Sequence, residues 1–257
     1  MDRSVLTAEQ MAEFAARGIV RVPALVSPGQ AADIADGVWA VLAYKGIHRD
    51  EPRTWPAGRL FKLQALTRAG HYRAFAEGHA AMCDELLGAG HWRAVNAPGP
   101  LLTFPEDGVW QVPRHGWHFD LPARGSLDPP IALRLLGLVE PVDSHGGGTI
   151  IVAGTHTLTG RLVAAAGGDF GRSVDVRRRL AADHQWFRDL FEDDAQRDRF
   201  LEPVDIEGVI VGAAELTGDA GDAYLMHPWL LHAAAPNAGT QVRSMLTHSV
   251  LANGYRQ

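Results

Sequence analysis

The feature that most constrains the fold is a change in sequence pattern near residue 92. From there to the C-terminus, short apolar runs alternate with glycine and proline, which is typical of β-strands joined by turns. Before residue 92, longer segments carry apolar residues at helical spacing. We therefore expect an α+β protein whose mainly β core is a sandwich or barrel, with the early helices packed outside it. Strands are expected at 101–104, 117–121, 131–139, 149–152, 209–213, 223–226 and 242–250.

Two capping boxes predict where the first helices begin. Thr7 is followed three residues later by Gln10, and Ser27 is followed in the same way by Gln30. In this motif the two side chains satisfy backbone N–H groups that the first helical turn leaves without partners. A short apolar strand is expected between the two helices, at 19–22.

Two further segments have a helical pattern. A third helix is expected over residues 72–87, and a highly charged helical insertion over about 173–201. The insertion is interpreted either as a solvated amphipathic helix or as a lid over a pocket mouth. Because no linker composition interrupts the chain, residues 1–257 are expected to form a single domain.

Composition limits the metal chemistry and the partners. Cys83 is the only cysteine, which excludes an intramolecular disulfide and a thiolate metal cluster and suits a reducing cytoplasm. The net charge of −6 argues against nucleic acid or an anionic membrane as the main partner, and no apolar run is long enough to span a membrane. We expect a cytoplasmic protein with a small-molecule substrate. Any metal would be held by carboxylates and some of the 12 histidines.

A His-x-Asp motif on a strand aims an imidazole and a carboxylate at one point, and the chain contains two such motifs. His48 and Asp50 lie in a charged segment that we interpret as a solvated loop. His118 and Asp120 instead alternate with apolar neighbours, as on a half-buried strand. Two polar groups that face a core need partners. A shared metal ion would supply one, and a simple His/Asp hydrogen bond is the alternative.

A non-haem iron site would need a second histidine, and the segment GDAYLMHPWLLHAAAPNAGTQVR over residues 221–243 offers two. This segment resembles the phytanoyl-CoA dioxygenase family of Fe(II)/2-oxoglutarate oxygenases. In that family Gly-Asp, an apolar strand, a histidine, Pro-Asn and an arginine follow in order, with the arginine eleven residues after the histidine. The spacing selects His232, which is followed by Arg243, over His227, for which a structural or supporting role is expected.

The resemblance extends over most of the chain and implies a double-stranded β-helix, the cupin-like jelly roll. It includes the opening LTAEQMAEFAARGIVRVPALVSPG and the stretch HGGGTIIVAGTH. Lys62, in the segment FKLQ, resembles a lysine that helps to hold the cosubstrate. Ala234 departs from the pattern, because many relatives have serine there to contact the far carboxylate of the cosubstrate. Thr149 is the candidate to replace that hydroxyl.

The resemblance also implies a mechanism. Fe(II) would be held by the catalytic residues His118, Asp120 and His232, and Arg243 would pair with the far carboxylate of 2-oxoglutarate. With O2, the enzyme would release succinate and CO2 while oxidising an unactivated C–H bond. Halogenating relatives lack the carboxylate ligand, so Asp120 favours hydroxylation. The alternatives are a metal-dependent jelly-roll enzyme that does not use 2-oxoglutarate, in which Arg243 would bind an acidic substrate, and a non-catalytic jelly-roll binding protein.

Two other histidines receive structural interpretations. His79 lies on the apolar face of the third helix and is expected in the core. His115 is expected in a solvated loop, with a supporting role beside the metal as the alternative. The glycines at 146–148 lack the strand-to-helix context of a phosphate-binding loop.

Overall fold

The computed structural model describes residues 5–60, 63–68, 70–193 and 196–255. Its helices are α1 (Ala8–Arg17), α2 (Pro28–Ala43), the 3-10 helix η1 (Pro52–Thr54), α3 (Gln64–Arg68), α4 (Arg73–Leu87), α5 (Thr155–Ala165), α6 (Ser173–Asp183), α7 (Gln185–Glu192) and the 3-10 helix η2 (Arg197–Leu201). Its strands are β1 (Ile19–Val22), β2 (Arg59–Leu60), β3 (Trp92–Ala94), β4 (Gly99–Thr103), β5 (Ala123–Arg124), β6 (Ala132–Leu138), β7 (Thr149–Ala153), β8 (Asp169–Gly171), β9 (Val204–Ile206), β10 (Val209–Glu215), β11 (Ala223–Met226), β12 (Leu231–Ala234) and β13 (Arg243–Ala252).

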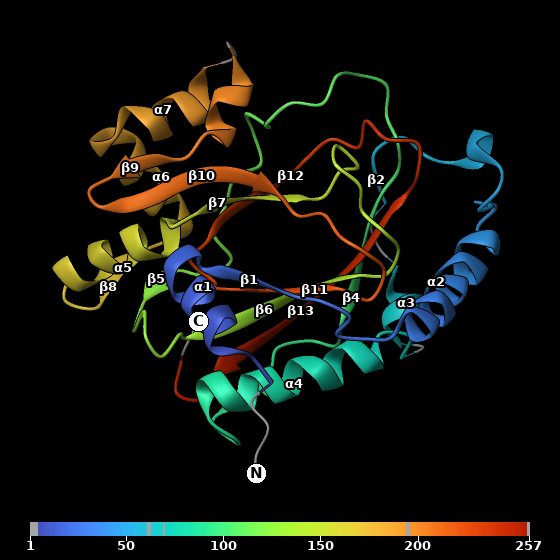
Figure 1. Cartoon of the computed structure of the whole chain (residues 1–257), viewed down its shortest axis with the longest axis horizontal. Coiled ribbons are helices and arrows are strands. Elements are labelled where there is room, and N and C mark those ends of the chain that lie inside the picture. The colour runs from blue at the N-terminus through green and yellow to red at the C-terminus, as the bar shows by residue number, and fades with distance from the viewer. Residues whose placement is uncertain (1–4, 61–62, 69, 194–195, 256–257) are drawn as a thin grey trace.

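Two antiparallel sheets face each other across the centre of the molecule (Figure 1). The larger has the order β1-β11-β6-β13-β4-β2, with β3 also paired to β13, and the smaller has the order β12-β7-β10-β9. Strands that are neighbours in a sheet are mostly far apart in the chain, as in a jelly roll. The expected jelly-roll fold, with helices outside a β core, is therefore confirmed.

Both predicted capping boxes are present. The Thr7 hydroxyl accepts a hydrogen bond from the Gln10 backbone N–H at 3.2 Å, and the Gln10 side chain accepts one from the Thr7 N–H at 2.9 Å. Ser27 and Gln30 make the same reciprocal pair at the start of α2. These caps satisfy N–H groups that have no partner within the helix, so both starts are set locally by the sequence.

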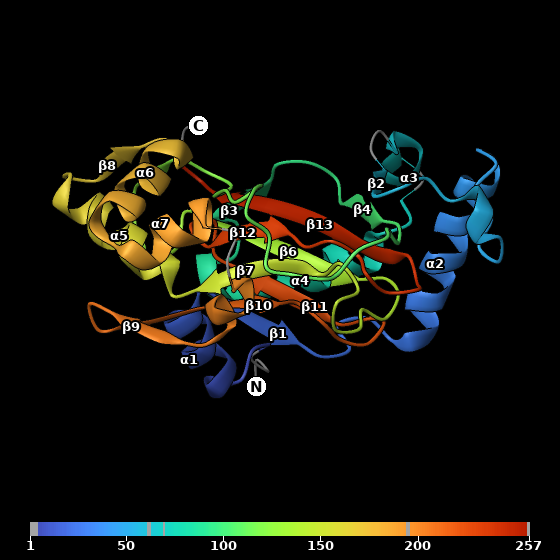
Figure 2. The same cartoon turned by 90° about the horizontal axis from the view of Figure 1, so that it is seen from above.

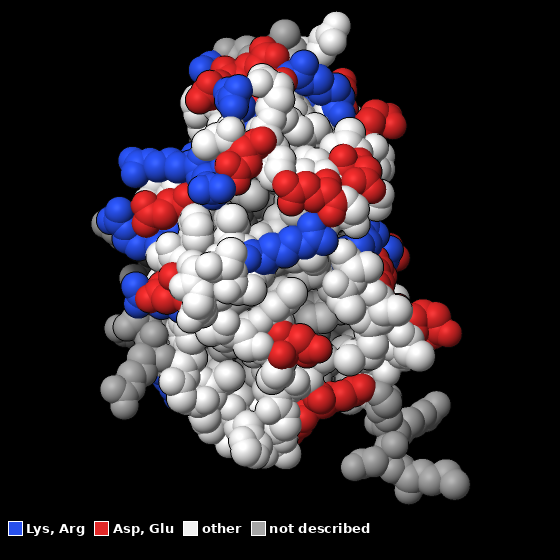
Figure 3. Space-filling view, turned by 90° about the vertical axis from the view of Figure 1, so that its left-hand side faces the viewer, with Lys and Arg blue, Asp and Glu red and all other residues white. Residues whose placement is uncertain are grey.

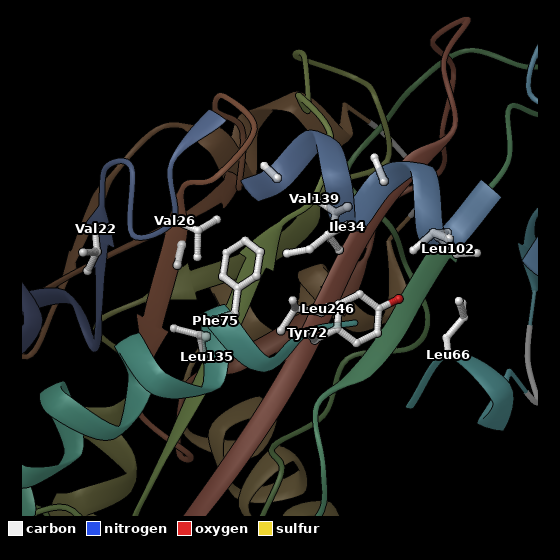
Figure 4. Close-up of a cluster of buried hydrophobic side chains, with 14 of the residues drawn as sticks. Val22, Val26, Ile34, Leu66, Tyr72, Phe75, Leu102, Leu135, Val139 and Leu246 are labelled. Carbon is white, nitrogen blue, oxygen red and sulfur yellow. The ribbon is translucent and has the colours of Figure 1, made fainter. Parts of the chain in front are cut away.

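Helices α2 and α4 cover the outer face of the larger sheet (Figure 4). Phe75 of α4 and Ile34 of α2 pack in one cluster with Leu135 and Leu246 of the sheet. At Gly137 of β6 a Cβ atom would lie only 2.7 Å from the Phe75 ring, so glycine is what allows α4 to approach the sheet. Because helices cover the outer face of the larger sheet, only its inner face is available to line a functional site.

The segment 173–201, expected to be helical, contains α6, α7 and η2. These helices group with α5 at one end of the molecule (Figure 2). Phe187 and Leu190 of α7 are fully buried in a cluster that also contains Trp117 and Phe119. The insertion therefore packs against the segment that carries the His118-x-Asp120 motif.

Apart from the buried Arg197, the described charged side chains of the insertion are exposed or partly exposed. Figure 3 shows both signs of charge interspersed on this end of the molecule. Several of them pair with each other, as in the Arg179–Asp183 bridge at 2.6 Å and the Arg199–Asp193 bridge at 2.7 Å. This arrangement matches the interpretation of the insertion as an amphipathic, solvated helical segment.

Within the described residues, no helix combines the length and apolarity that a membrane crossing requires.

One expected strand is wrong, and six strands of the structure were not expected: β2, β3, β5, β8, β9 and β12. The segment 117–121 forms no ladder and makes only an isolated bridge from His118 to His232. Gly116 has φ 84° and Pro122 cannot donate a ladder hydrogen bond, so the chain leaves the sheet on both sides of the motif. Conversely, the alanine-rich β12 was not predicted, because alanine has little strand preference. Its strand conformation comes from pairing with β7.

Buried histidines make the fold sensitive to acid. His79 is fully buried, as expected, with its Nδ1 3.0 Å from Nδ1 of His248, and burial lowers the pKa of His79 to about 3. Burial also lowers the pKa of His227 to about 3. Because both histidines bind protons more readily when unfolded, the free energy of unfolding should fall as the pH drops below 6.5. From pH 7 to 5.5 the loss should be about 1 kcal/mol for each.

Urea denaturation at the two pH values measures this loss. In a His79→Gln variant, the decrease in unfolding free energy from pH 7 to 5.5 should be smaller by about 1 kcal/mol, whatever the stability of the variant at pH 7. Glu215, whose pKa burial raises, works in the opposite direction. An unfolding free energy that stays constant from pH 7 to 5.5 in the metal-free protein would contradict the assignment of these histidines as neutral.

Candidate functional site

The structure brings His118 and His232 together, although 113 positions separate them in the chain. The His118 N–H donates to the His232 carbonyl at 2.9 Å, and the reverse bond measures 3.1 Å. The two imidazole rings lie with their centroids 4.2 Å apart. The isolated bridge thus aligns a loop histidine with a histidine of β12.

Each of these imidazoles is held by a backbone carbonyl. Nδ1 of His118 lies 2.8 Å from the Gly116 oxygen, and Nδ1 of His232 lies 2.9 Å from the Leu230 oxygen. A carbonyl oxygen only accepts hydrogen bonds, so in both rings Nδ1 carries the proton and Nε2 has a free lone pair. This is the arrangement in which a histidine is oriented as a metal ligand by its other nitrogen.

Asp120 completes the group. Its Oδ1 lies 3.5 Å from Nε2 of His232, and one donor atom each from His118, Asp120 and His232 lie within 4.8 Å of one another. The Asp120 side chain is only 8% exposed, and its Oδ2 has no hydrogen bond from any described residue. Two imidazole nitrogens and a carboxylate oxygen converging on one point form the facial donor set that suits Fe(II).

The protonation state of His232 suits metal binding. Burial lowers the pKa of His232 to about 4, an effect that the neighbouring Asp120 carboxylate opposes and His118 reinforces. At neutral pH the imidazole is therefore neutral, with its lone pair available.

Arg243, at the start of β13, lies in the interior of the same site. Its Nη1 donates to the Leu101 carbonyl at 3.1 Å and its Nη2 to the Thr103 hydroxyl. It is 4% exposed, and burial lowers its pKa to about 9, with Arg59 acting in the same direction. No carboxylate of the described residues lies within ion-pairing distance of it. A buried guanidinium with no anionic partner is a ready site for an anionic ligand.

A cavity of about 350 Å³ connects the triad histidines to Arg243. Thr149 lines it, and so does Ala234, which lies directly opposite Thr149 in the β12–β7 ladder. Thr149 therefore lies beside Ala234, the position at which the resemblance led us to expect a serine. Lys62 lies outside the described residues.

Two further arginines line this cavity and were not predicted from the sequence: Arg59 and Arg134. Arg59 of β2 and Arg243 of β13 both lie opposite Thr103 of the intervening strand β4, so these three residues form a row across adjacent strands. Arg134, on β6, also lines the cavity. Neither Arg59 nor Arg134 belongs to a motif, and only the strand order could have identified them. Within the part of the chain that the structure describes, no acidic residue lines this cavity.

The helical insertion supports the loop that carries His118 and Asp120. The Ser173 hydroxyl, at the start of α6, accepts a hydrogen bond from the Phe119 N–H at 3.0 Å, between the two motif residues. The buried Arg197 guanidinium donates to the carbonyls of Val112 and Pro113 at 3.0 and 2.7 Å. The insertion therefore holds this loop against β12.

The other residues of the 221–243 motif have architectural roles. Asp222 pairs with Arg21 and accepts the Ala24 N–H, which joins β11 to the turn after β1. The fully buried Asn237 donates to the carbonyls of Thr103 and Gln241. It thereby ties the β12–β13 connection to β4, which sets the position of Arg243 relative to His232.

The remaining histidines lie away from the triad. Nδ1 of His227 accepts the Trp229 N–H at 3.0 Å, which gives it the structural role expected. His48 and Asp50 are exposed between α2 and η1, and His115 is exposed in the loop before the motif. Among the described residues, the triad is the one group of His, Cys, Asp or Glu side chains close enough to hold a metal ion.

The comparison with protein families agrees with the motif order and the fold. A model described as phytanoyl-CoA dioxygenase (PhyH) matches residues 14–245. The chain belongs to this family. No curated protein matches this member of the phytanoyl-CoA dioxygenase family by sequence.

Several solved structures have the same fold as this family member. The epimerase SnoN, in complex with Fe3+, alpha-ketoglutarate and nogalamycin RO, has a TM-score of 0.58 at 17% identity, over 97% of this chain and 85% of SnoN. EctD from S. alaskensis with bound Fe has a TM-score of 0.59 at 17% identity, over 98% and 79% of the two chains. HygX from Streptomyces hygroscopicus, with nickel and 2-oxoglutarate bound, has a TM-score of 0.56 at 15% identity, over 97% and 88%.

Proposed function

We propose that this member of the phytanoyl-CoA dioxygenase family is an Fe(II)- and 2-oxoglutarate-dependent dioxygenase that hydroxylates a small molecule. The observation that carries the proposal is the cavity that joins the two triad histidines to the buried Arg243, which has no carboxylate partner among the described residues. A metal at one end and a guanidinium at the other suit a cosubstrate with a chelating 2-oxo acid at one end and a carboxylate at the other. Relatives crystallised with iron or nickel and this cosubstrate support the same assignment.

The residues have distinct roles in this proposal. His118, Asp120 and His232 hold the metal, with the Nδ1–carbonyl hydrogen bonds keeping both rings in the tautomer that ligates. Arg243 binds the far carboxylate, and the Thr149 hydroxyl supplies the contact that Ala234 cannot make. We propose that Lys62 also contacts the cosubstrate.

The bound group would supply the oxidation itself. Fe(II), 2-oxoglutarate and O2 provide the means to oxidise an unactivated C–H bond, with release of succinate and CO2. The chain orients the reactants, and the burial of Arg243 and His232 keeps water from that part of the site. The exposed His118 marks where the site is open to solvent. The carboxylate of Asp120 favours hydroxylation over halogenation. We propose one jelly-roll domain, with 173–201 as its helical insertion, acting in the cytoplasm.

Anaerobic titration tests this proposal. Adding Fe(II) and then 2-oxoglutarate to the metal-free protein should produce a weak visible charge-transfer band, and admitting O2 should convert 2-oxoglutarate to succinate. A protein that retains iron but gives neither the band nor succinate would instead be a metal-dependent enzyme that does not use 2-oxoglutarate. A protein that binds no metal would be a non-catalytic jelly-roll binding protein.

A further inference from the structure

Arg134 lies where two cavities approach the metal-ligating residues. It belongs to β6, where it is opposite Met226 of β11 and Ser249 of β13. It lines the main cavity together with His118 and His232. It also lines a second cavity of about 160 Å³, whose lining includes Asp120 and Ser249. The guanidinium therefore lies beside the triad, between the two spaces.

Most of the hydrogen-bonding capacity of Arg134 is unused. Its Nε lies 2.7 Å from Oδ2 of Asp120, an ion pair whose two atoms are outside hydrogen-bonding geometry. The described residues provide no hydrogen bond to either Nη group. The Arg134 side chain is only 26% exposed, so solvent replaces these bonds only in part. A partly buried guanidinium whose Nη groups make no hydrogen bonds to described residues can bind a carboxylate or phosphate through bidentate hydrogen bonds.

The charges of the proposed holoenzyme leave the positive charge of Arg134 incompletely balanced. Asp120 is the one charged partner of Arg134, and in the proposed function its charge is shared with a divalent metal ion. The cosubstrate's two carboxylates are used by the metal and by Arg243. Among the described residues, no acidic residue lines the main cavity, and Asp120 is the only one that lines the second. Partly burying a guanidinium whose charge is incompletely balanced is costly, so an anionic group on another ligand would stabilise it.

We propose that the substrate of this enzyme is an acid whose carboxylate or phosphate group binds the Nη groups of Arg134 in the second cavity. This inference rests on the proposed function, because it assigns the main cavity to 2-oxoglutarate. The second cavity has the volume of about five water molecules, which is enough for such a group and a few carbon atoms. Ser249, opposite Arg134 on the same face of the sheet, offers a hydroxyl as a second donor.

Paired ligands test this inference without knowledge of the natural substrate. The protein is loaded with Ni(II) and 2-oxoglutarate and titrated calorimetrically with carboxylic acids, with alkyl phosphates, and with the primary amides that match the acids in shape. At least one acid or phosphate should bind roughly tenfold more tightly than its neutral counterpart. Arg134→Gln should abolish this preference, and Arg134→Lys should keep part of it.

The control is Arg124→Gln, which removes an arginine from a comparable but exposed pair, Arg124 Nε to Asp169 Oδ1 at 2.9 Å. It should leave the preference unchanged. The inference is wrong if amides bind as well as acids, if no acid or phosphate binds, or if the preference survives in Arg134→Gln. It is equally wrong if Arg134→Gln weakens Ni(II) binding more than about threefold, since Arg134 would then be a positioning residue for Asp120. Failure of the wild-type protein to bind Ni(II) and 2-oxoglutarate would instead refute the proposed function.

Discussion

Replacing Asp120 with alanine is expected to weaken metal binding by at least about 100-fold and to reduce succinate formation below detection. The carboxylate is one of only three converging donors, and loss of even an outer-shell partner typically costs 10- to 100-fold in metal affinity. The change also leaves Arg134 without its charged partner. Calorimetric titration of the metal-free protein with Fe(II) or Co(II) measures the affinity directly, without depending on turnover.

The chain contains its own control for this experiment. Asp50→Ala disrupts the second His-x-Asp motif, in which His48 and Asp50 are exposed in a loop. It should leave metal affinity and the unfolding free energy within experimental error of the wild type. Asp120→Asn, which keeps the shape of the side chain but not its charge, should fall between wild type and Asp120→Ala. Full metal affinity in Asp120→Ala would rule out the proposed triad.

Replacing Arg243 with methionine is expected to raise the dissociation constant of 2-oxoglutarate by about 100-fold while metal affinity changes less than threefold. Removing one partner of a buried, charge-assisted pair costs about 2–5 kcal/mol, and Arg243 is 4% exposed. Arg243 supplies none of the three donor atoms of the metal group, so the two affinities should separate. The charge-transfer band, followed as 2-oxoglutarate is added anaerobically, reports the cosubstrate affinity.

Two further variants make this result specific. Arg243→Lys keeps the charge but loses the planar fork, so it should recover only part of the affinity. Arg59→Met removes the more exposed guanidinium of the same row and should have a smaller effect. Unchanged 2-oxoglutarate affinity in Arg243→Met would favour the alternative in which this arginine binds an acidic substrate.

Local features of the fold were readable from the sequence. The capping boxes at Thr7 and Ser27 act within four residues, so the composition of a short segment is sufficient to predict them. Most strands of the larger sheet also lie where apolar runs predicted them. The expected strand at 117–121 failed because its apolar alternation reflects packing against the helical insertion, not ladder pairing. Burial and strand pairing produce the same alternation in a sequence.

The sequence by itself determined which chemistry is available. One cysteine excludes thiolate sites, and the ordered spacing identified His118, Asp120, His232 and Arg243. The structure brings donor atoms of the first three within 4.8 Å of one another, and the two histidines line one cavity with Arg243. Only the tertiary structure decided which other residues surround these four. Arg134 meets Asp120 and Ser173 meets Phe119 through contacts between segments 14 and 54 residues apart, and Arg59 lies two strands from Arg243. Such neighbours follow from the order of strands in a jelly roll, which depends on the packing of the whole chain and not on any local pattern.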